Sequence, residues 1–425
     1  MFKNIGSYNE SKKVNRPTVK ERIISINLIV GFFLAFSGYY AALIVLTNLA
    51  TGAGSRNLTI PLRLIIVSSF GIIFLMRPKI GLQKGLTFFL FFAFAYLSRI
   101  LIESLDYSSK FQITEIEFFL YFTSFVLIPL VFTSQIRLSE SDYSKIFIVL
   151  MIGTIILSIL TFYFYKQLIG TVVRISLVIK HNQNYISPLA LSYGSVLGIG
   201  VGIGYLLTNK VGRLKKLFIY TTIMISFVPF FLGASRGSIL ALSFPFVFYL
   251  FFAQGIKKRA HIIISMGVLC IFLIISTAYF GSGVFFRFAN ISHDIESSSS
   301  SAGRLEIWRY SLIQFINNPV FGNSLNCTKV NFHPHNILLE VLITTGIIGF
   351  IPFFLFLCSI FTKMKVIVKQ HSEYFWICVI FLQAFTQNMF SGGIYSAGWL
   401  AIGGGLILGV NIRDRVKNEN FDHSA

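Results

Sequence analysis

Acidic residues are scarce in this sequence. Its 425 residues include 16 Asp and Glu against 36 Lys and Arg, and charged residues make up 12% of the chain, where a soluble domain averages roughly 25%. Cysteine is also rare, with four in total, and three lie in apolar runs where a thiol packs as a small apolar group: Cys270, Cys358 and Cys378. These shortages exclude a soluble domain and predict neither a disulfide framework nor a zinc site.

Apolar residues fill the chain instead. The residues A, V, I, L, M, F, W, Y and C make up 55% of it, and runs long enough to cross about 30 Å of hydrocarbon recur from end to end. This pattern predicts an all-α, polytopic integral membrane protein with about twelve transmembrane helices. The expected spans are 23–46, 59–76, 86–102, 116–134, 146–165, 188–208, 217–232, 237–254, 262–280, 335–358, 374–391 and 394–410.

The distribution of positive charge orients these spans. A formal net charge of +20 would suggest nucleic acid as a partner of a soluble protein, but roughly two thirds of the 36 Lys and Arg fall in the tails and loops of one side. This bias predicts cytoplasmic termini, and nucleic acid is not expected as a partner. The predicted organisation is a cytoplasmic tail 1–22, a transmembrane scaffold 23–165, a second transmembrane region 166–410 with an extracytoplasmic loop 281–334, and a cytoplasmic tail 411–425.

Arginines recur on the side predicted to face outward. Arg174 lies in the loop 166–187, Arg236 lies in a tight turn between Gly233 and Gly237, and Arg304 begins the later part of the long loop. A guanidinium presents a planar fork that matches phosphate oxygens in pairs. These arginines are therefore candidate phosphate ligands, although each could instead contact lipid headgroups. Arg99, near the end of a span, could have a functional role, but snorkelling to the outer interface is the simpler account.

The long loop contains a helical pattern. Apolar residues recur at helical spacing from Leu305 to Ile316, and the sequence Asn317-Asn318-Pro319 ends the run. The pattern predicts an amphipathic helix lying on the outer leaflet.

Two histidines follow at the start of a span. Pro334 suits the first turn of a helix, which would place His335 and Asn336 in that turn, where the helix dipole disfavours a protonated imidazole. A neutral His335 could accept a proton as a general base, and His333 could assist. Glu340 lies one turn deeper and could orient a side chain or hold a sugar hydroxyl. The alternative is that the histidines only anchor the chain at the interface.

The order of four short motifs resembles the O-antigen ligase and O-antigen polymerase superfamily of bacterial envelopes. The motifs are SRG at 235–237, RLEIW at 304–308, NPVFG at 318–322 and HNILLEVLITTGIIG at 335–349. The resemblance covers roughly residues 165 to 360, while the earlier spans match only as generic apolar helices.

The resemblance implies glycosyl transfer on the outer face of the bacterial inner membrane. The donor would be a glycan on a polyprenyl pyrophosphate, and the acceptor another lipid-linked repeat unit or the lipid A core. His335 would be the general base, assisted by His333, and Arg174, Arg236 and Arg304 would bind the pyrophosphate. Membrane lipids, chain-length regulators and flippases would be its partners.

The leaving pyrophosphate needs its charge stabilised by a divalent metal or by arginines. The outward loops contain no Asp-x-Asp pair, so we expect a metal-independent enzyme without a cofactor. We favour a polymerase, because that is the commoner activity of similar chains in surface-polysaccharide loci, and a ligase stays open. A transporter of lipid-linked sugars would usually show two related halves, and this chain shows no such repeat.

Overall fold

The computed structural model describes residues 18–49, 55–105, 114–169, 187–233, 235–253 and 300–411, with scattered positions between 255 and 275. In these ranges the regular secondary structure is helical, and two isolated β-bridges are the only strand-like pairing, so the all-α prediction is confirmed for them. The first helices are α1 (Val19–Ala35), α2 (Ser37–Leu49), α3 (Ser55–Met76), α4 (Lys84–Leu105), α5 (Glu115–Tyr121), the π-helix η1 (Phe122–Leu127), α6 (Ile128–Gln135), α7 (Glu140–Tyr165) and the 3₁₀ turn η2 (Lys166–Leu168). The later ones are α8 (Pro188–Thr208), α9 (Arg213–Gly233), α10 (Arg236–Phe252), α14 (Ser300–Asn317), α15 (Ile337–Gln370), η4 (Ser372–Tyr374), α16 (Phe375–Phe390), η5 (Ile394–Ser396) and α17 (Gly398–Gly409).

The lengths of the helices fit a protein that crosses a membrane several times. Seven of the described helical segments are long and apolar enough to cross one, or eight if the bent pair α1 and α2 forms one span. The expected span 262–280 falls largely outside the described residues. The total of twelve spans and the cytoplasmic placement of the termini therefore stay predictions. Towards the C-terminus the expected span 394–410 is shortened, because its α-helix begins only at Gly398.

The first expected span is not one helix, which corrects the prediction for 23–46. Helices α1 and α2 meet at Phe36 with a bend of 74°. Such a break frees backbone carbonyls, which need partners inside a membrane. The indole Nε1 of Trp399 donates to the carbonyl of Ala35 at 2.8 Å, and the hydroxyl of Ser37 donates to the carbonyl of Gly194 at 2.9 Å. Distant segments thus stabilise the bend.

Helices α16 and α17 lie in the interior of the bundle. Most side chains of α16 are buried, including the indole of Trp376, and α17 packs against α16 and α6. Glycines make this packing close: a Cβ atom at Gly405 would overlap the hydroxyl of Thr133, and one at Gly403 would lie 3.1 Å from the backbone of Phe381. Small residues of this kind let transmembrane helices approach each other closely.

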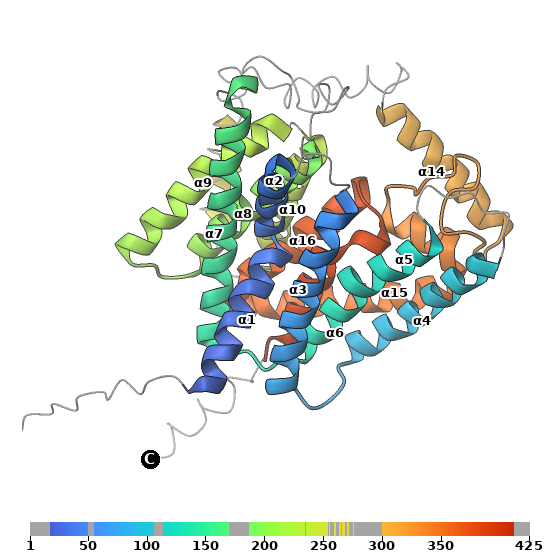
Figure 1. Ribbon diagram of the computed structural model, residues 1–425, viewed down its shortest axis with the longest axis horizontal. Coiled ribbons are helices and arrows are strands. Elements are labelled where there is room, and N and C mark those ends of the chain that lie inside the picture. The colour runs from blue at the N-terminus through green and yellow to red at the C-terminus, as the bar shows by residue number, and fades with distance from the viewer. Residues whose placement is uncertain are drawn as a thin grey trace, which may run out of the picture.

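Basic residues of segments predicted to be cytoplasmic bind the ends of neighbouring helices at one end of the bundle. Arg77 forms a 2.8 Å ion pair with Asp142, and the ammonium of Lys363 donates to the carbonyl of Leu408 at 2.7 Å. Helices α4 and α15 run side by side, and α14 lies across the end of the molecule away from the start of α1 (Figure 1). The candidate site lies beneath α14.

Candidate active site

The segment before α15 holds the two histidines in an irregular loop. Helix α15 begins at Ile337, and the side chain of Asn336 caps it by accepting from the backbone N–H groups of Leu338 at 3.1 Å and Leu339 at 3.2 Å. The prediction that Pro334 opens the helix, with His335 in its first turn, is therefore wrong. An Asn side chain satisfies the unpaired donors of a helix start better than Pro can. Asn336 thus has a structural role.

His335 has an unusual backbone conformation. Its φ angle is +56°, in the left-handed region that few residues other than glycine adopt, although His, Asn and Asp are enriched there. Trp308 of α14 donates from its indole Nε1 to the carbonyl of Pro334 at 2.8 Å and so fixes the preceding residue. Strained conformations of this kind persist where the surroundings impose them, and they cluster at functional sites.

The two imidazoles lie in contact within an aromatic cluster. The ring centroids of His333 and His335 are 4.3 Å apart at an interplanar angle of 72°. His333 stacks on Phe332 at 4.3 Å, and its edge faces the ring of Tyr395 at 5.9 Å. Only 9% of His333 is exposed. The structure thus brings both predicted histidines together with a tyrosine from a distant segment.

Burial keeps both imidazoles neutral. It lowers the pKa of His335 to about 4, an effect to which the positive charge of Arg304 adds, whereas a hydrogen bond with the backbone of Gly392 opposes it. Burial and the neighbouring His335 lower the pKa of His333 to about 3. Nδ1 of His335 is buried and has no hydrogen-bond partner among the described residues. A hydroxyl group that reached this nitrogen could donate a hydrogen bond to it.

Glu340 fixes the loop that faces the histidines. Its carboxylate is fully buried and accepts from the backbone N–H of Ile394 with both oxygens, at 3.0 and 3.1 Å. The neighbouring Gly393 leaves little room for a side chain, because a Cβ there would lie 3.1 Å from the carboxylate. Glu340 therefore holds the loop 391–397, which carries Gly392 and Tyr395. No motif in the sequence marked this loop.

Arg304 is the predicted arginine that the structure places beside the imidazole. Burial lowers the pKa of its guanidinium, whereas the phenol of Tyr193 raises it, and its charge acts on His335. Tyr193 is buried on α8, and its hydroxyl lies against Gly237, the residue after Arg236. Arg236 is half-buried at the first position of α10.

Tyr193 thus interacts with Arg304 and lies against the segment of Arg236, and no sequence pattern pointed to this tyrosine. Arg174 lies outside the described residues. The described part of the chain contains no group of three or more His, Cys, Asp and Glu side chains that could hold a metal ion.

Helix α15 is broken at Gly346, where the φ angle is +59°. The NPVFG loop fills the break: the N–H of Ile347 donates to the carbonyl of Pro319 at 2.9 Å, and a Cβ at Gly346 would overlap the carbonyl of Val320. The segment 337–345 is thereby a short helix of its own, set between the histidine loop and this break.

Arg99 of α4 closes the break. Its guanidinium donates to the carbonyl of Thr344 at 3.0 Å and to those of Phe321 and Gly322 at 2.8 Å each. The account in which Arg99 only snorkels is therefore wrong. Carbonyls released by a broken helix need donors, and an arginine offers several in one plane. Arg99 stabilises the loop that supports the candidate site.

The helix expected in the long loop is present as α14, and its orientation differs from a simple amphipathic pattern. Ser311 and Gln314 are buried, whereas Leu312 and Ile316 are exposed. The amide of Gln314 donates to Asn323 at 2.8 Å and accepts from the backbone N–H of Thr328 at 2.8 Å. Polar contacts thus dock α14 on the loop that follows it, and apolar side chains face outward.

Comparison with known proteins agrees with this part of the chain. Residues 221–354 match the family described as O-antigen ligase. A Rickettsia conorii protein described as a candidate polysaccharide ligase is 26% identical over 132 aligned residues, covering 26% of this chain and 31% of that protein. No solved structure matches the chain. The resemblance to the O-antigen ligase and polymerase superfamily is thereby confirmed.

The family match includes most of the predicted site. Arg236, Arg304, His335 and Glu340 fall within residues 221–354. Tyr193 and the loop 391–397 fall outside it, and the tertiary structure adds them to the site. The match to the Rickettsia protein spans about a third of that protein's length.

Proposed function

We propose that this protein is a glycosyltransferase that polymerises lipid-linked oligosaccharide repeat units into a surface polysaccharide on the outer face of the bacterial inner membrane. The observation that carries the proposal is the position of His335, whose imidazole is kept neutral by burial, is acted on by the charge of Arg304 and is hydrogen-bonded to the backbone of Gly392. A general base must be unprotonated, and a leaving diphosphate needs fixed positive charge nearby. The lowered pKa of His335 and the charge of Arg304 that acts on it support both requirements.

The reaction follows from these roles. The imidazole of His335 accepts the proton of an acceptor hydroxyl, and the oxygen attacks the anomeric carbon of the donor sugar. The bond between that carbon and the diphosphate oxygen breaks, and polyprenyl pyrophosphate leaves with the electron pair. Arg304 and Arg236 bind the diphosphate and stabilise its charge, and Arg174 is proposed as a third ligand. His333 shields the base from water within the aromatic cluster.

The electrostatics couple donor binding to base strength. In the unliganded site the positive charge of Arg304 helps to lower the pKa of His335 to about 4, after burial as the main cause. A bound diphosphate would offset that positive charge, so the pKa of the imidazole would rise towards its ordinary value of about 6.5. His335 would thus become a stronger base only when the donor is in place.

We propose that catalysis needs no metal ion, because the arginines supply the charge that a divalent cation would otherwise provide. Activity that survives chelating agents would support this proposal, whereas strict dependence on added magnesium or manganese would contradict it.

A ligase that transfers the polymer to the lipid A core is the second candidate. The matching family is described as O-antigen ligase, and the Rickettsia protein is described as a polysaccharide ligase. The same base and the same arginines would serve both reactions, because only the acceptor differs.

Deletion of the protein followed by electrophoresis of the surface polysaccharide tests the two candidates. Loss of the polymer ladder with a single repeat unit still attached to its anchor would indicate a polymerase. Loss of all attachment, with lipid-linked polymer accumulating, would indicate a ligase. An unchanged polysaccharide would contradict both.

Substitution of His335 tests the chemistry. His335→Asn keeps a residue that tolerates a positive φ angle and removes the base, so we expect transfer to fall by roughly 10²- to 10⁴-fold. His371→Asn changes a histidine at the opposite end of α15 and should leave transfer unchanged. A His335→Asn variant that is present in the membrane and fully active would refute the role of the base.

A further inference from the structure

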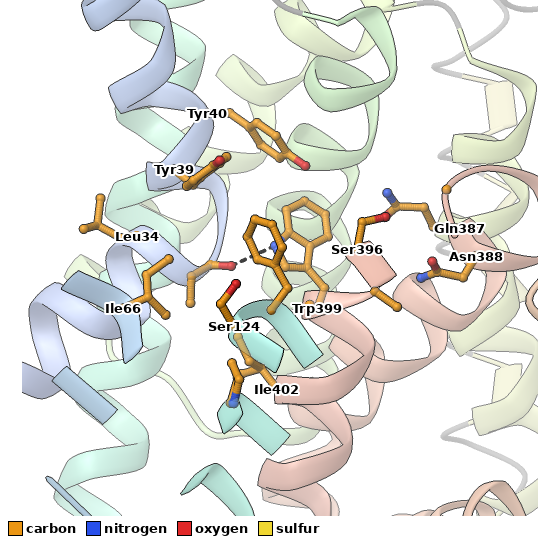
Figure 2. A pocket seen from close by; sticks show the side chains of 16 residues that line it. Leu34, Tyr39, Tyr40, Ile66, Ser124, Gln387, Asn388, Ser396, Trp399 and Ile402 are labelled. Carbon is orange, nitrogen blue, oxygen red and sulfur yellow. Dashed lines mark hydrogen bonds between the residues drawn. The ribbon is translucent and has the colours of Figure 1, made fainter. Parts of the chain in front are cut away.

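A cavity of about 180 Å³ lies at the bend between α1 and α2. Figure 2 shows Trp399 in its centre, with Tyr39 and Tyr40 on one side and Gln387, Asn388 and Ser396 on the other. The wall is built from α1, α2, α3, η1, α6, α16, η5 and α17, so it unites the first and the last parts of the chain. None of these residues belongs to a motif that the sequence shows.

The chemistry of the wall is that of a site for a neutral, hydroxyl-rich ring. Aromatic rings supply flat apolar faces: the centroids of Tyr40 and Trp399 are 5.7 Å apart, and those of Tyr39 and Phe125 are 6.4 Å apart. Hydroxyl and amide groups lie between them, and none of the lining side chains carries a charge. The guanidinium of Arg63 lies behind the wall, 4.3 Å from the ring centre of Phe125, and does not line the cavity. The lining itself suits a sugar, which presents both apolar C–H faces and hydroxyl groups.

Two polar groups of the wall have no hydrogen-bond partner among the described residues. The hydroxyl of Tyr40 and the side-chain amide of Gln387 make no hydrogen bond within the part of the chain that the structure describes, whereas the amide of Asn388 donates to the carbonyl of Ala384 at 2.8 Å. Polar groups that line a cavity and lack protein partners are free to bind a ligand.

One loop joins this cavity to the candidate active site. Gly392 and Ser396 line the cavity, while Gly392 also forms a hydrogen bond with His335 and Tyr395 faces His333. Arg304 acts on His335 as well, but no arginine lines the cavity. The imidazole of His335 thus interacts with the guanidinium of Arg304 and also with Gly392, which lines the uncharged cavity.

We propose that the cavity binds the sugar at the end of the acceptor glycan. The sugar next to it is the one whose hydroxyl His335 activates. This inference rests on the proposed function and adds the site of the acceptor. A volume of 180 Å³ is below the roughly 300–1,000 Å³ of pockets for drug-sized ligands, so the cavity takes one sugar ring and the rest of the glycan extends out of it.

Equilibrium binding of a radiolabelled oligosaccharide tests the proposal with the full-length protein in lipid nanodiscs. The probe is the repeat-unit oligosaccharide released from its lipid, because without a diphosphate it reports only on contacts to sugar. Tyr40→Phe and Gln387→Met each remove one polar group at nearly constant volume. We expect each to raise the Kd roughly two- to tenfold, as the loss of one hydrogen bond would. A second arm uses the core oligosaccharide of lipid A, and tighter binding of that probe would assign the cavity to a ligase acceptor.

The controls separate this proposal from the proposed function. Tyr163→Phe alters an exposed tyrosine of α7 and should leave the Kd unchanged, and His335→Asn should bind the probe while transfer is lost. Binding of polyprenyl pyrophosphate without sugar should be unaffected by Tyr40→Phe. Wild-type protein that binds neither oligosaccharide, or a Kd that both cavity variants leave unchanged in folded protein, would overturn the acceptor site. A fully active His335→Asn variant would instead overturn the proposed function.

Discussion

Arg304→Gln should change the pH dependence of transfer as well as its rate. The guanidinium of Arg304 contributes, after burial, to the low pKa of His335, which is about 4. Removing that charge removes one of the causes, so the pKa of the imidazole should rise towards 6.5. The acid limb of kcat/KM, which reports the ionisation of the free enzyme, should move to higher pH. The acid limb moves to higher pH because a protonated imidazole cannot act as a base.

The size of the effect has an upper limit. With a pKa of about 4, about 3% of the imidazole is protonated at pH 5.5, whereas with the ordinary pKa of about 6.5 this fraction would be about 90%. The ratio of activity at pH 5.5 to activity at pH 8 should therefore fall by at most about tenfold in the variant. The observed fall should be smaller, because burial is the largest cause of the low pKa and remains in place.

The assay is the transfer rate in proteoliposomes between pH 5 and pH 8, at donor concentrations below KM. The shape of the profile is compared rather than its height, because Arg304→Gln also weakens donor binding in the proposed mechanism. Arg309→Gln, an exposed position on the same helix, is the matched control and should keep the wild-type profile. A slower Arg304→Gln enzyme with an unchanged acid limb would refute the electrostatic coupling. An acid limb near pH 6.5 in the wild-type profile would show that the pKa of His335 is not lowered.

Three further variants test the supports of the site. Arg99→Lys keeps the charge but loses at least the hydrogen bond from Nε to the carbonyl of Thr344, so we expect about 1–3 kcal/mol of destabilisation in unfolding experiments in detergent; unchanged stability would contradict the closing role. Asn336→Ala should cost roughly 0.5–2 kcal/mol through the lost cap, with faster hydrogen exchange in the first turn of α15, whereas Asn336→Ser should cost less. Glu340→Ala leaves the N–H of Ile394 without its acceptor, which should cost about 1–3 kcal/mol of stability and reduce transfer. Glu340→Gln keeps an acceptor oxygen and should retain most of the transfer activity. An equal loss of activity in both variants would argue for a role of the charge itself.

Local patterns in the sequence were enough to predict the class of the fold and several candidate residues. Apolar runs predict helices in a membrane because a span must satisfy its own backbone hydrogen bonds. His333, His335 and Glu340 could be proposed because they stand within eight residues of one another at the start of an apolar run. Arg304 could be proposed as a candidate because it lies in a polar loop near the start of that run. Each of these inferences depends on neighbours along the chain.

The exact ends and breaks of the helices could not be predicted in the same way. The bend at Phe36 depends on the indole of Trp399, and the break at Gly346 depends on the NPVFG loop and on Arg99. The carbonyls of Ala35 and Thr344 accept from Trp399 and Arg99, which lie hundreds of residues away in the chain. A sequence pattern records which residues are apolar, but it does not record which distant donor meets which carbonyl.

By itself, then, the sequence determined that the chain is helical and apolar, and that arginines and histidines gather in its later half. Only the tertiary structure decided that His335 is buried beside Arg304, that Gly392 faces the same ring, and that Tyr40 shares a cavity with Gln387. The physical reason is that helix formation is set by interactions within one segment, whereas burial, a shifted pKa and a cavity arise from the packing of segments that are far apart in the chain.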